Sequence, residues 1–283
     1  MLRFALLALA ASPAIGQEAI PLRDLLDATH VHGIAGGTGG LDSVTLASHH
    51  GLWSVDLATG TATRIGTSAD DFMGYSVVSG DAGQAFASGH PAMGGNIGII
   101  RTDDGGATWT HVSDGLDGPV DFHNLEVSLA DPAVIYGIIH DGTVQRSADS
   151  GVTWEVSGQA PGELIDIATS YTDSDTIYAA TEAGLFVSPD KGATWQGVTA
   201  GAPVTSVDVG ADGLLRAAEL GRGLLSIDAK GTVSVLSPEL PDGYLLFLAS
   251  THADPHRLSA LSAKGQLISS DDGGATWTNA ATD

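Results

Sequence analysis

A pattern of eight residues that occurs four times constrains the fold of this chain more than any other feature. It reads Ser/Thr-x-Asp-x-Gly-x-Thr-Trp and occupies residues 102–109, 147–154, 188–195 and 270–277. The Asp side chain can accept backbone N–H bonds within a tight turn, the Gly can adopt a positive φ, and Thr-Trp begins the next strand with a large ring. The pattern therefore predicts four copies of one strand–turn–strand element.

The spacing of the four copies indicates a regular repeat. Their tryptophans are separated by 45, 41 and 82 residues, at Trp109, Trp154, Trp195 and Trp277. Because 82 is twice 41, a degenerate unit falls in the last gap, where Ser226 and Asp228 remain without the Trp. A second degenerate unit, marked by Ser54 and Asp56, lies near the N-terminus.

This repeat predicts a β-propeller. A period of about 40 to 45 residues with several short strands per unit is typical of that fold, since one blade alone cannot bury both of its faces. We expect an all-β, six-bladed propeller with four-stranded blades that start near residues 29, 70, 121, 162, 202 and 243. Residues 17–283 then form a single domain, in which 17–28 is either a short helix or part of the ring closure.

The N-terminus has the pattern of a secretory signal peptide. Arg3 precedes an apolar run over residues 4–11, and small residues at 14 and 16 suit signal peptidase, so residues 1–16 are expected to be removed by cleavage near Gly16. The run is too short to span a bilayer and no similar run follows, which predicts no membrane span. The chain has no cysteine, so it can form neither a disulfide nor a lipoprotein anchor. We expect a periplasmic or secreted protein.

The charge balance argues against nucleic acid as a partner. The chain has 34 acidic and 11 basic residues, a formal net charge of −23. Binding nucleic acid requires clustered Lys and Arg, whereas here the acids are scattered through the expected turns, as on a well-solvated surface.

Histidines and methionines recur at corresponding positions of the first three units. They fall at the start of each inner strand and at the turn from the second to the third strand. In a four-stranded meander these two places lie at the same face, whereas the Asp-containing turns lie at the other. We therefore expect one mouth of the central channel to gather His30, His32, His49, His50, Met73, His90, Met93, His123 and His140. The remaining histidines, His111, His252 and His256, are expected at the surface elsewhere.

The other three units carry different groups at these positions. The acid and polar candidates around the mouth are Asp71, Asp121, Glu163, Glu182, Glu219 and Arg222, together with Tyr244 and Lys264. The predicted mouth is therefore lopsided, with a histidine-rich half opposite a half that carries acids and two basic groups.

Imidazole and thioether groups without thiolate indicate a transition-metal site. Met is a soft ligand and His binds both copper oxidation states, which favours copper, while His with Asp71 or Asp121 would also satisfy zinc. The expected ligands are His32, His50, His90 and His123, with His30, His49, Met73 and His140 as alternates or orienting groups.

Several strings around these residues resemble a known family. The strings HVHGIA (30–35), ASHHGLW (47–53), DDFMGYSVV (70–78) and ASGHP (87–91), followed by the repeated pattern, look like exported bacterial Asp-box (BNR-repeat) propellers commonly labelled glycosylhydrolase-like or exo-sialidase-like. The resemblance covers nearly the whole mature chain and implies a propeller without an established substrate. A sialidase would need three arginines around its substrate, and here only Arg222 is well placed. The sequence therefore argues against sialidase activity.

Two alternatives to metal binding stay open at this point. A glycoside-hydrolase-like enzyme would use two mouth carboxylates about 5 to 9 Å apart, drawn from Asp71, Asp121, Glu163, Glu182 and Glu219. A non-catalytic scaffold, resembling Asp-box photosystem assembly factors, would grip a protein partner with the few aromatic groups near the mouth, Phe72, Tyr75, Phe122 and Tyr244. Our leading hypothesis is a periplasmic metal-binding propeller whose mouth takes a metal ion or a small ligand.

Overall fold

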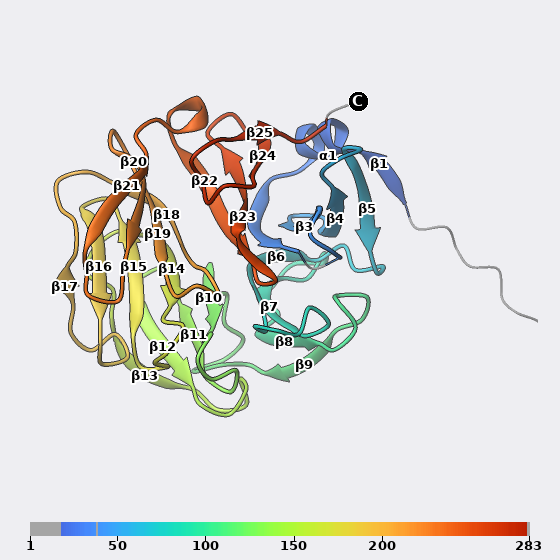
Figure 1. The fold of residues 1–283 in the computed structure, drawn as a ribbon. Coiled ribbons are helices and arrows are strands. Elements are labelled where there is room, and N and C mark those ends of the chain that lie inside the picture. The colour runs from blue at the N-terminus through green and yellow to red at the C-terminus, as the bar shows by residue number, and fades with distance from the viewer. Residues whose placement is uncertain (1–17, 38, 282–283) are drawn as a thin grey trace, which may run out of the picture.

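The computed structural model describes residues 18–37 and 39–281, so the expected signal peptide lies outside the described residues. Within them the chain is built of short strands (Figure 1). The helical elements are α1 (Leu22–Ala28) and one 3-10 turn (Pro241–Gly243). No helix in the described ranges has the length and apolar character needed to cross a membrane.

Four sheets contain four antiparallel strands each, ordered as in the chain. The first has β6 (Asp71–Val77), β7 (Ala85–His90), β8 (Ile99–Thr102) and β9 (Thr110–Ser113). The second has β10 (Asn124–Val127), β11 (Ile135–Ile138), β12 (Thr143–Ser147) and β13 (Glu155–Gln159). The third has β14 (Leu164–Thr169), β15 (Ile177–Thr181), β16 (Gly184–Ser188) and β17 (Gln196–Gly197). The fourth has β18 (Val204–Val209), β19 (Leu215–Glu219), β20 (Gly223–Ile227) and β21 (Val233–Ser237).

A nine-stranded sheet joins the two ends of the chain. It contains one meander of β2 (Val31–Gly36), β3 (Ser43–Ser48), β4 (Gly51–Asp56) and β5 (Thr61–Ile65). It also contains a second meander of β22 (Leu245–Thr251), β23 (Asp254–Ser262), β24 (Leu267–Ser270) and β25 (Thr278–Asn279). The inner strands β2 and β22 meet in parallel at Gly36 and Thr251, and β1 (Ala19–Pro21) adds to the outer edge of β5. The described part of the segment 17–28, residues 18–28, thus contributes both a strand and a helix.

The sheets stand around a central channel, and the apolar core lies between neighbouring sheets (Figure 1). In β6 buried and half-buried residues alternate, as expected of a strand that packs one face against its neighbour. Phe122 packs against Trp154 with ring centroids 5.0 Å apart, and Phe72 packs against Trp109 at 5.2 Å. The tryptophans of the repeated pattern therefore help to fill these spaces between sheets.

The repeated Asp forms the turn that the sequence predicts. In the copy at 147–154, Asp149 accepts hydrogen bonds from the Thr153 backbone N–H (2.8 Å) and hydroxyl (2.7 Å), and Ser147 Oγ accepts from Gly151 N–H (2.9 Å). The same three bonds occur in the copies at 102–109, 188–195 and 270–277. Each turn joins the third strand of a sheet to the fourth.

Candidate metal-binding site

The channel mouth is formed where the inner strands begin. In four of the meanders the residue after the second strand donates its backbone N–H to the residue just before the inner strand, as in His49 to His30 (3.2 Å). The same bond recurs from Glu182 to Glu163, Leu220 to Pro203 and Ala263 to Tyr244. Strand starts and second-to-third turns therefore meet at one face.

Five inner strands open with a β-bulge at the same place. The residue left out of the strand register is His32, Met73, Ile165, Thr205 and Leu246, respectively. Bulges bend a strand and re-aim side chains, and they are frequent beside functional sites. His32, Met73, Ile165 and Leu246 line the central cavity of about 380 Å³, together with His123 at the start of the remaining inner strand.

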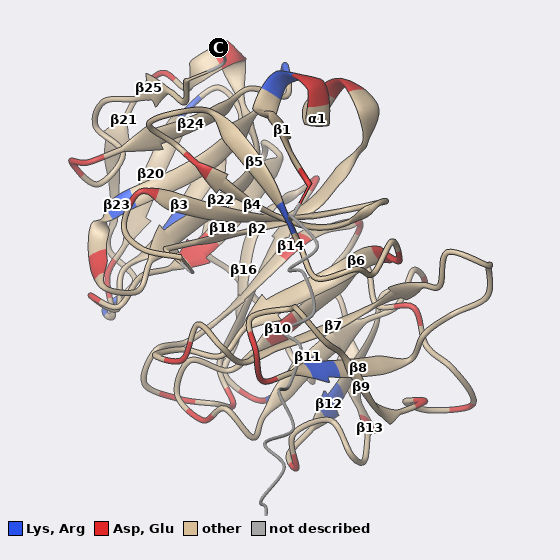
Figure 2. Ribbon diagram, turned by 90° about the vertical axis from the view of Figure 1, so that its right-hand side faces the viewer, with Lys and Arg blue, Asp and Glu red and all other residues tan. Residues whose placement is uncertain are grey.

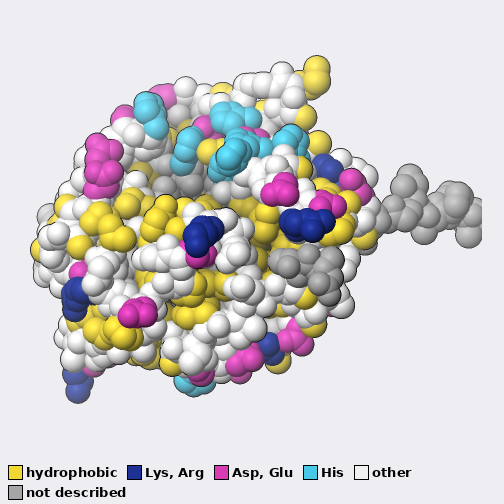
Figure 3. All heavy atoms as spheres, turned by 90° about the horizontal axis from the view of Figure 1, so that it is seen from above, with side chains coloured by type: hydrophobic (Ala, Val, Ile, Leu, Met, Phe, Trp, Pro, Cys, Tyr) yellow, Lys and Arg dark blue, Asp and Glu magenta, His cyan; other side chains and the backbone are white. Residues whose placement is uncertain are grey.

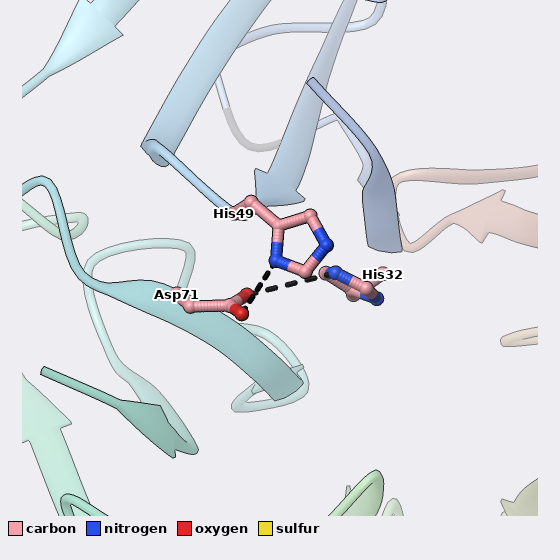
Figure 4. A group of neighbouring side chains, drawn as sticks. All are labelled: His32, His49 and Asp71. Atoms are coloured by element: carbon pink, nitrogen blue, oxygen red, sulfur yellow. Dashed lines mark hydrogen bonds and ion pairs between the residues drawn. The ribbon is translucent and has the colours of Figure 1, made fainter. Parts of the chain in front are cut away.

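His32, His49 and Asp71 form the tightest cluster at this face (Figure 4). Each offers one donor atom, and these atoms lie within 4.8 Å of one another. His49 Nδ1 is 2.5 Å from Asp71 Oδ2, and the His32 and His49 rings meet edge to face with centroids 4.3 Å apart. Asp71 comes from β6, whereas both histidines come from the β2–β5 meander, so the cluster bridges neighbouring sheets.

Two atoms of this cluster are buried without a hydrogen-bond partner. His32 Nε2 and Asp71 Oδ1 face each other at 3.6 Å, which is too long for a hydrogen bond. Burial lowers the pKa of His32 below its usual value, and the nearby histidines add to this, although Asp71 acts in the opposite direction. His32 is therefore a neutral imidazole at pH 7, the form that binds metal ions.

A second group lies at the next junction between sheets. Asp121 Oδ2 is 3.2 Å from His90 Nε2 and 2.9 Å from His123 Nε2. Asp121 Oδ1 is buried without a partner. His90 Nδ1 donates a hydrogen bond to the carbonyl oxygen of Gly95 at 2.9 Å. The histidines that the sequence assigned to one cluster are thus divided between two acids.

The other predicted metal ligands lie at the edge of these groups or away from them. His30 packs its ring edge to face against His49 at 5.5 Å, and the exposed His50 directs Nδ1 to Thr29 Oγ1 at 3.0 Å. His140 is exposed and lies close to Asp141, and Met93 is 96% exposed. The geometry therefore favours His49 over His50 as a central residue.

Most of the predicted acid and polar residues of the mouth are either paired with another charged group or exposed to solvent. Glu163 and Glu182 are exposed. Glu219 is buried and paired with Arg222 at 3.1 Å, and Lys264 pairs with Asp242 at 2.8 Å. In contrast, four residues at the bulges, strand starts and second-to-third turns of this half are apolar or aromatic and exposed: Ile165, Leu220, Tyr244 and Leu246.

Sequence reasoning missed three carboxylates deeper in the channel, Glu126, Asp166 and Asp208, on β10, β14 and β18. Burial raises the pKa of Glu126 to about 8 and that of Asp166 to about 6, and it also raises the pKa of Asp208. Ser76 donates to Glu126 at 3.1 Å, and Ser206 donates to Asp166 at 3.0 Å. The signal for these residues is an acid that has an apolar residue on either side within an inner strand.

Charged side chains are spread over the surface, whereas most histidines lie together in one region of it. Acidic residues are scattered over the turns and basic residues are few (Figure 2). Histidines gather in one region of the face seen in Figure 3, beside hydrophobic side chains. Outside that region, His111 pairs with Asp114 at 3.0 Å, His252 lies 3.2 Å from Ser79 Oγ at another part of the cavity wall, and His256 is exposed.

Comparisons with known proteins identify the fold. No protein-family profile and no curated protein sequence matches this chain. Among solved structures it is similar to a GH74 xyloglucanase from Xanthomonas campestris, with 20% identity and a TM-score of 0.60 over 90% of this chain and 46% of the enzyme. It is also similar to a GH74 enzyme from Niastella koreensis, with 15% identity and a TM-score of 0.61 over 89% of this chain and 45% of the enzyme. This chain thus spans less than half the length of either enzyme.

A third similar structure is YCF48 bound to a D1 peptide, with 19% identity and a TM-score of 0.55 over 97% of this chain and 87% of YCF48. Identities this low carry the fold and leave function to the site itself. Together with the four-stranded sheets around a channel, these likenesses identify the chain as a β-propeller.

Proposed function

We propose that this chain is an exported, six-bladed propeller of the Asp-box type that binds a transition-metal ion at His32, His49 and Asp71. The blade count treats the two meanders of the nine-stranded sheet as separate blades. The Asp-box assignment rests on the four equivalent turns and on the resemblance of the sequence strings. The periplasmic or secreted location rests on the N-terminal sequence pattern.

The observation that carries the metal proposal is the unpartnered pair of atoms. Buried polar atoms normally have partners, and leaving one unsatisfied costs about 1–3 kcal/mol. Two ligand atoms at about 2.1 Å from one ion in tetrahedral geometry lie about 3.4 Å apart. The 3.6 Å between His32 Nε2 and Asp71 Oδ1 matches that spacing. The contact of His49 with the other oxygen of Asp71 keeps the third group of the site next to the carboxylate.

Copper is the preferred ion and zinc the alternative. Nitrogen and oxygen ligands satisfy both ions, whereas a thioether favours copper. Met73 lines the same cavity as His32, so the mouth as a whole offers a thioether besides its imidazoles. Because the chain has no cysteine, the ligands at hand for copper are imidazoles, carboxylates and this thioether.

Metal analysis of matched variants tests the proposal. The wild type, Asp71→Asn and the control His111→Gln are purified after expression with copper and zinc, dialysed and analysed for both metals. Stoichiometric metal is expected in the wild type and the control, with affinity lowered by about tenfold or more in Asp71→Asn. Free ion at 100 times Kd should stabilise the fold by about 2.7 kcal/mol and so raise the Tm. A metal-free wild type with an unchanged Tm would refute the proposal.

A second function, docking of a protein partner at the same mouth, has separate support. Ile165, Leu220, Tyr244 and Leu246 are each at least 37% exposed around one half of the mouth. A contiguous exposed apolar surface is a common feature of protein interaction sites. YCF48, of similar fold, is known in complex with a D1 peptide. A pull-down in the absence of metal should fail to recover a partner with the Leu246→Asp variant. It should still recover the partner with the Val235→Asp variant, in which the changed side chain lies on an outer strand.

The hydrolase alternative receives less support. Asp71 and Asp121 are engaged by imidazoles, and Glu219 is paired with Arg222. A glycosidase needs one carboxylate free to attack or to activate water and one to protonate the leaving group. Turnover of a glycoside panel that is lost in Glu163→Gln would favour the hydrolase over metal binding.

A further inference from the structure

We propose that the mouth holds a second metal site, formed by His90, Asp121 and His123 at the next junction between sheets, and that this site binds softer ions than the first. The inference rests on the proposed function of the His32, His49 and Asp71 site. It goes beyond that function because it assigns two separate ions to two adjacent junctions. Three observations support it: strand register, donor geometry and the residue at the bulge.

Strand register makes the two junctions equivalent. His90 pairs with Asp71 across β6 and β7, and His49 N–H bonds to His30 before β2, so His90 occupies in its sheet the place that His49 occupies in the first meander. Asp121 precedes Phe122 as Asp71 precedes Phe72, and both phenylalanines are buried against a repeat tryptophan. Each junction thus places a turn histidine of one sheet beside an acid of the next.

Donor geometry at the second junction is that of a partly assembled site. Both imidazole nitrogens approach the same oxygen of Asp121, at 3.2 and 2.9 Å, while its other oxygen is buried and unpartnered. The Asp121 side chain is only 17% exposed, whereas His90 and His123 are 38% and 49% exposed. Asp121 is therefore the more buried part of the site, whereas both imidazoles are accessible to an ion from solvent.

The bulge residue distinguishes the two junctions. At the first junction the bulge of the inner strand supplies His32, and at the second the equivalent bulge supplies Met73. Met73 and His123 both line the central cavity, which brings a thioether and one imidazole of the second group to the same cavity. A site that gains a thioether in place of an imidazole shifts its preference from zinc toward Cu(I). Both junctions can bind copper, and the second, whose bulge residue is a thioether, should bind Cu(I) the more tightly of the two.

Stoichiometry measured on single variants tests this inference. The wild type, Asp71→Asn, Asp121→Asn and His111→Gln are titrated with Cu(I) under anaerobic conditions against a chromophoric chelator, and separately with Zn²⁺. Two equivalents of Cu(I) are expected in the wild type and in His111→Gln, and one in each Asp variant. Met73→Leu should weaken Cu(I) binding at the second site by about tenfold or more and leave Zn²⁺ binding at the first unchanged. Circular dichroism and Tm confirm that each variant is folded, and His90→Gln replaces Asp121→Asn if that variant unfolds.

The outcomes separate this inference from the function on which it rests. A wild type that binds no metal would overturn both. One equivalent that is lost in Asp71→Asn and kept in Asp121→Asn would overturn the second site and leave the first. One equivalent that is lost in either variant would mean a single ion shared by both junctions, which also overturns the inference.

Discussion

Glu126 lines the channel, and its replacement by Gln gives a sharp test of the electrostatics. Burial, with smaller contributions from the nearby Asp166 and Asp208, raises the pKa of this carboxyl from 4.5 to about 8, although the hydrogen bond from Ser76 acts in the opposite direction. The folded state therefore holds a proton on Glu126 at neutral pH that the unfolded chain has released. Gln resembles the protonated acid in size and keeps an oxygen that can accept the Ser76 hydroxyl.

The sign and size of the effect follow from linkage. Below pH 4.5 Glu126 is protonated in both states, so its pKa shift has no effect on stability there. As the pH rises from 4.5 to about 8 the unfolded state alone loses the proton, and the free energy of unfolding falls. A shift from 4.5 to about 8 corresponds to an upper limit of roughly 5 kcal/mol. Water in the channel reduces this, and about 2 kcal/mol would change the Tm by roughly 4–8 °C.

The assay is the Tm of the wild type and Glu126→Gln between pH 4.5 and pH 9. The two proteins should unfold at similar temperatures at pH 4.5, and the variant should become the more stable one as the pH approaches 9. The control Glu163→Gln makes the same change at an exposed glutamate just before the neighbouring inner strand, where the stabilisation expected of Glu126→Gln should not appear. A Glu126→Gln difference that stays flat with pH, or that turns unfavourable at pH 9, would refute the reasoning.

Three further predictions address the fold and the turns. Gly137→Ala should lower the Tm by several degrees because its Cβ would overlap the buried Phe122 ring, at a cost of about 1–3 kcal/mol, whereas Gly197→Ala, whose Cβ would meet Phe186 at 3.9 Å, should have little effect. Asp272→Ala should lower the Tm at pH 7 because the Asp272 turn is lost. The pKa of Asp272 is lowered from 3.8 to about 2, so its contribution is full above pH 3.8, and the gap between the two proteins should close only as the pH falls toward 2. Trp154→Phe should reduce stability at every pH because it removes the bond from the indole N–H to the Gly151 carbonyl (2.9 Å), and an unchanged thermal melt would contradict that role.

The all-β fold and the local turns could be predicted from the sequence because they depend on neighbouring residues. The acceptor role of Asp149 and its equivalents follows from a spacing of four residues to the Thr that donates to them. The six predicted unit starts lie within three residues of the inner strands that begin at Val31, Asp71, Asn124, Leu164, Val204 and Leu245. His49 and His90 lie where the second strand ends, which is one of the two places at which histidines recur in the sequence.

The pairing between sheets could not be predicted from the sequence. His49 bonds to Asp71 and His90 lies beside Asp121, in each case an acid of the next sheet, and this depends on how the ring of sheets brings neighbours together. The alternation of residues along a strand also does not reveal the bulges that bring His32 and Met73 to the cavity wall. For the same reason the sequence ranked His50 above His49.

The repeat, its turns and the side of the propeller that carries the histidines were thus determined by the sequence alone, because hydrogen bonds within a turn and strand alternation act over a few residues. Tertiary structure decided which histidine meets which acid, and that Glu126 holds its proton at neutral pH. Those properties depend on distances and on burial between groups on different sheets, which lie 22 residues apart in the chain for His49 and Asp71 and 50 residues apart for Ser76 and Glu126.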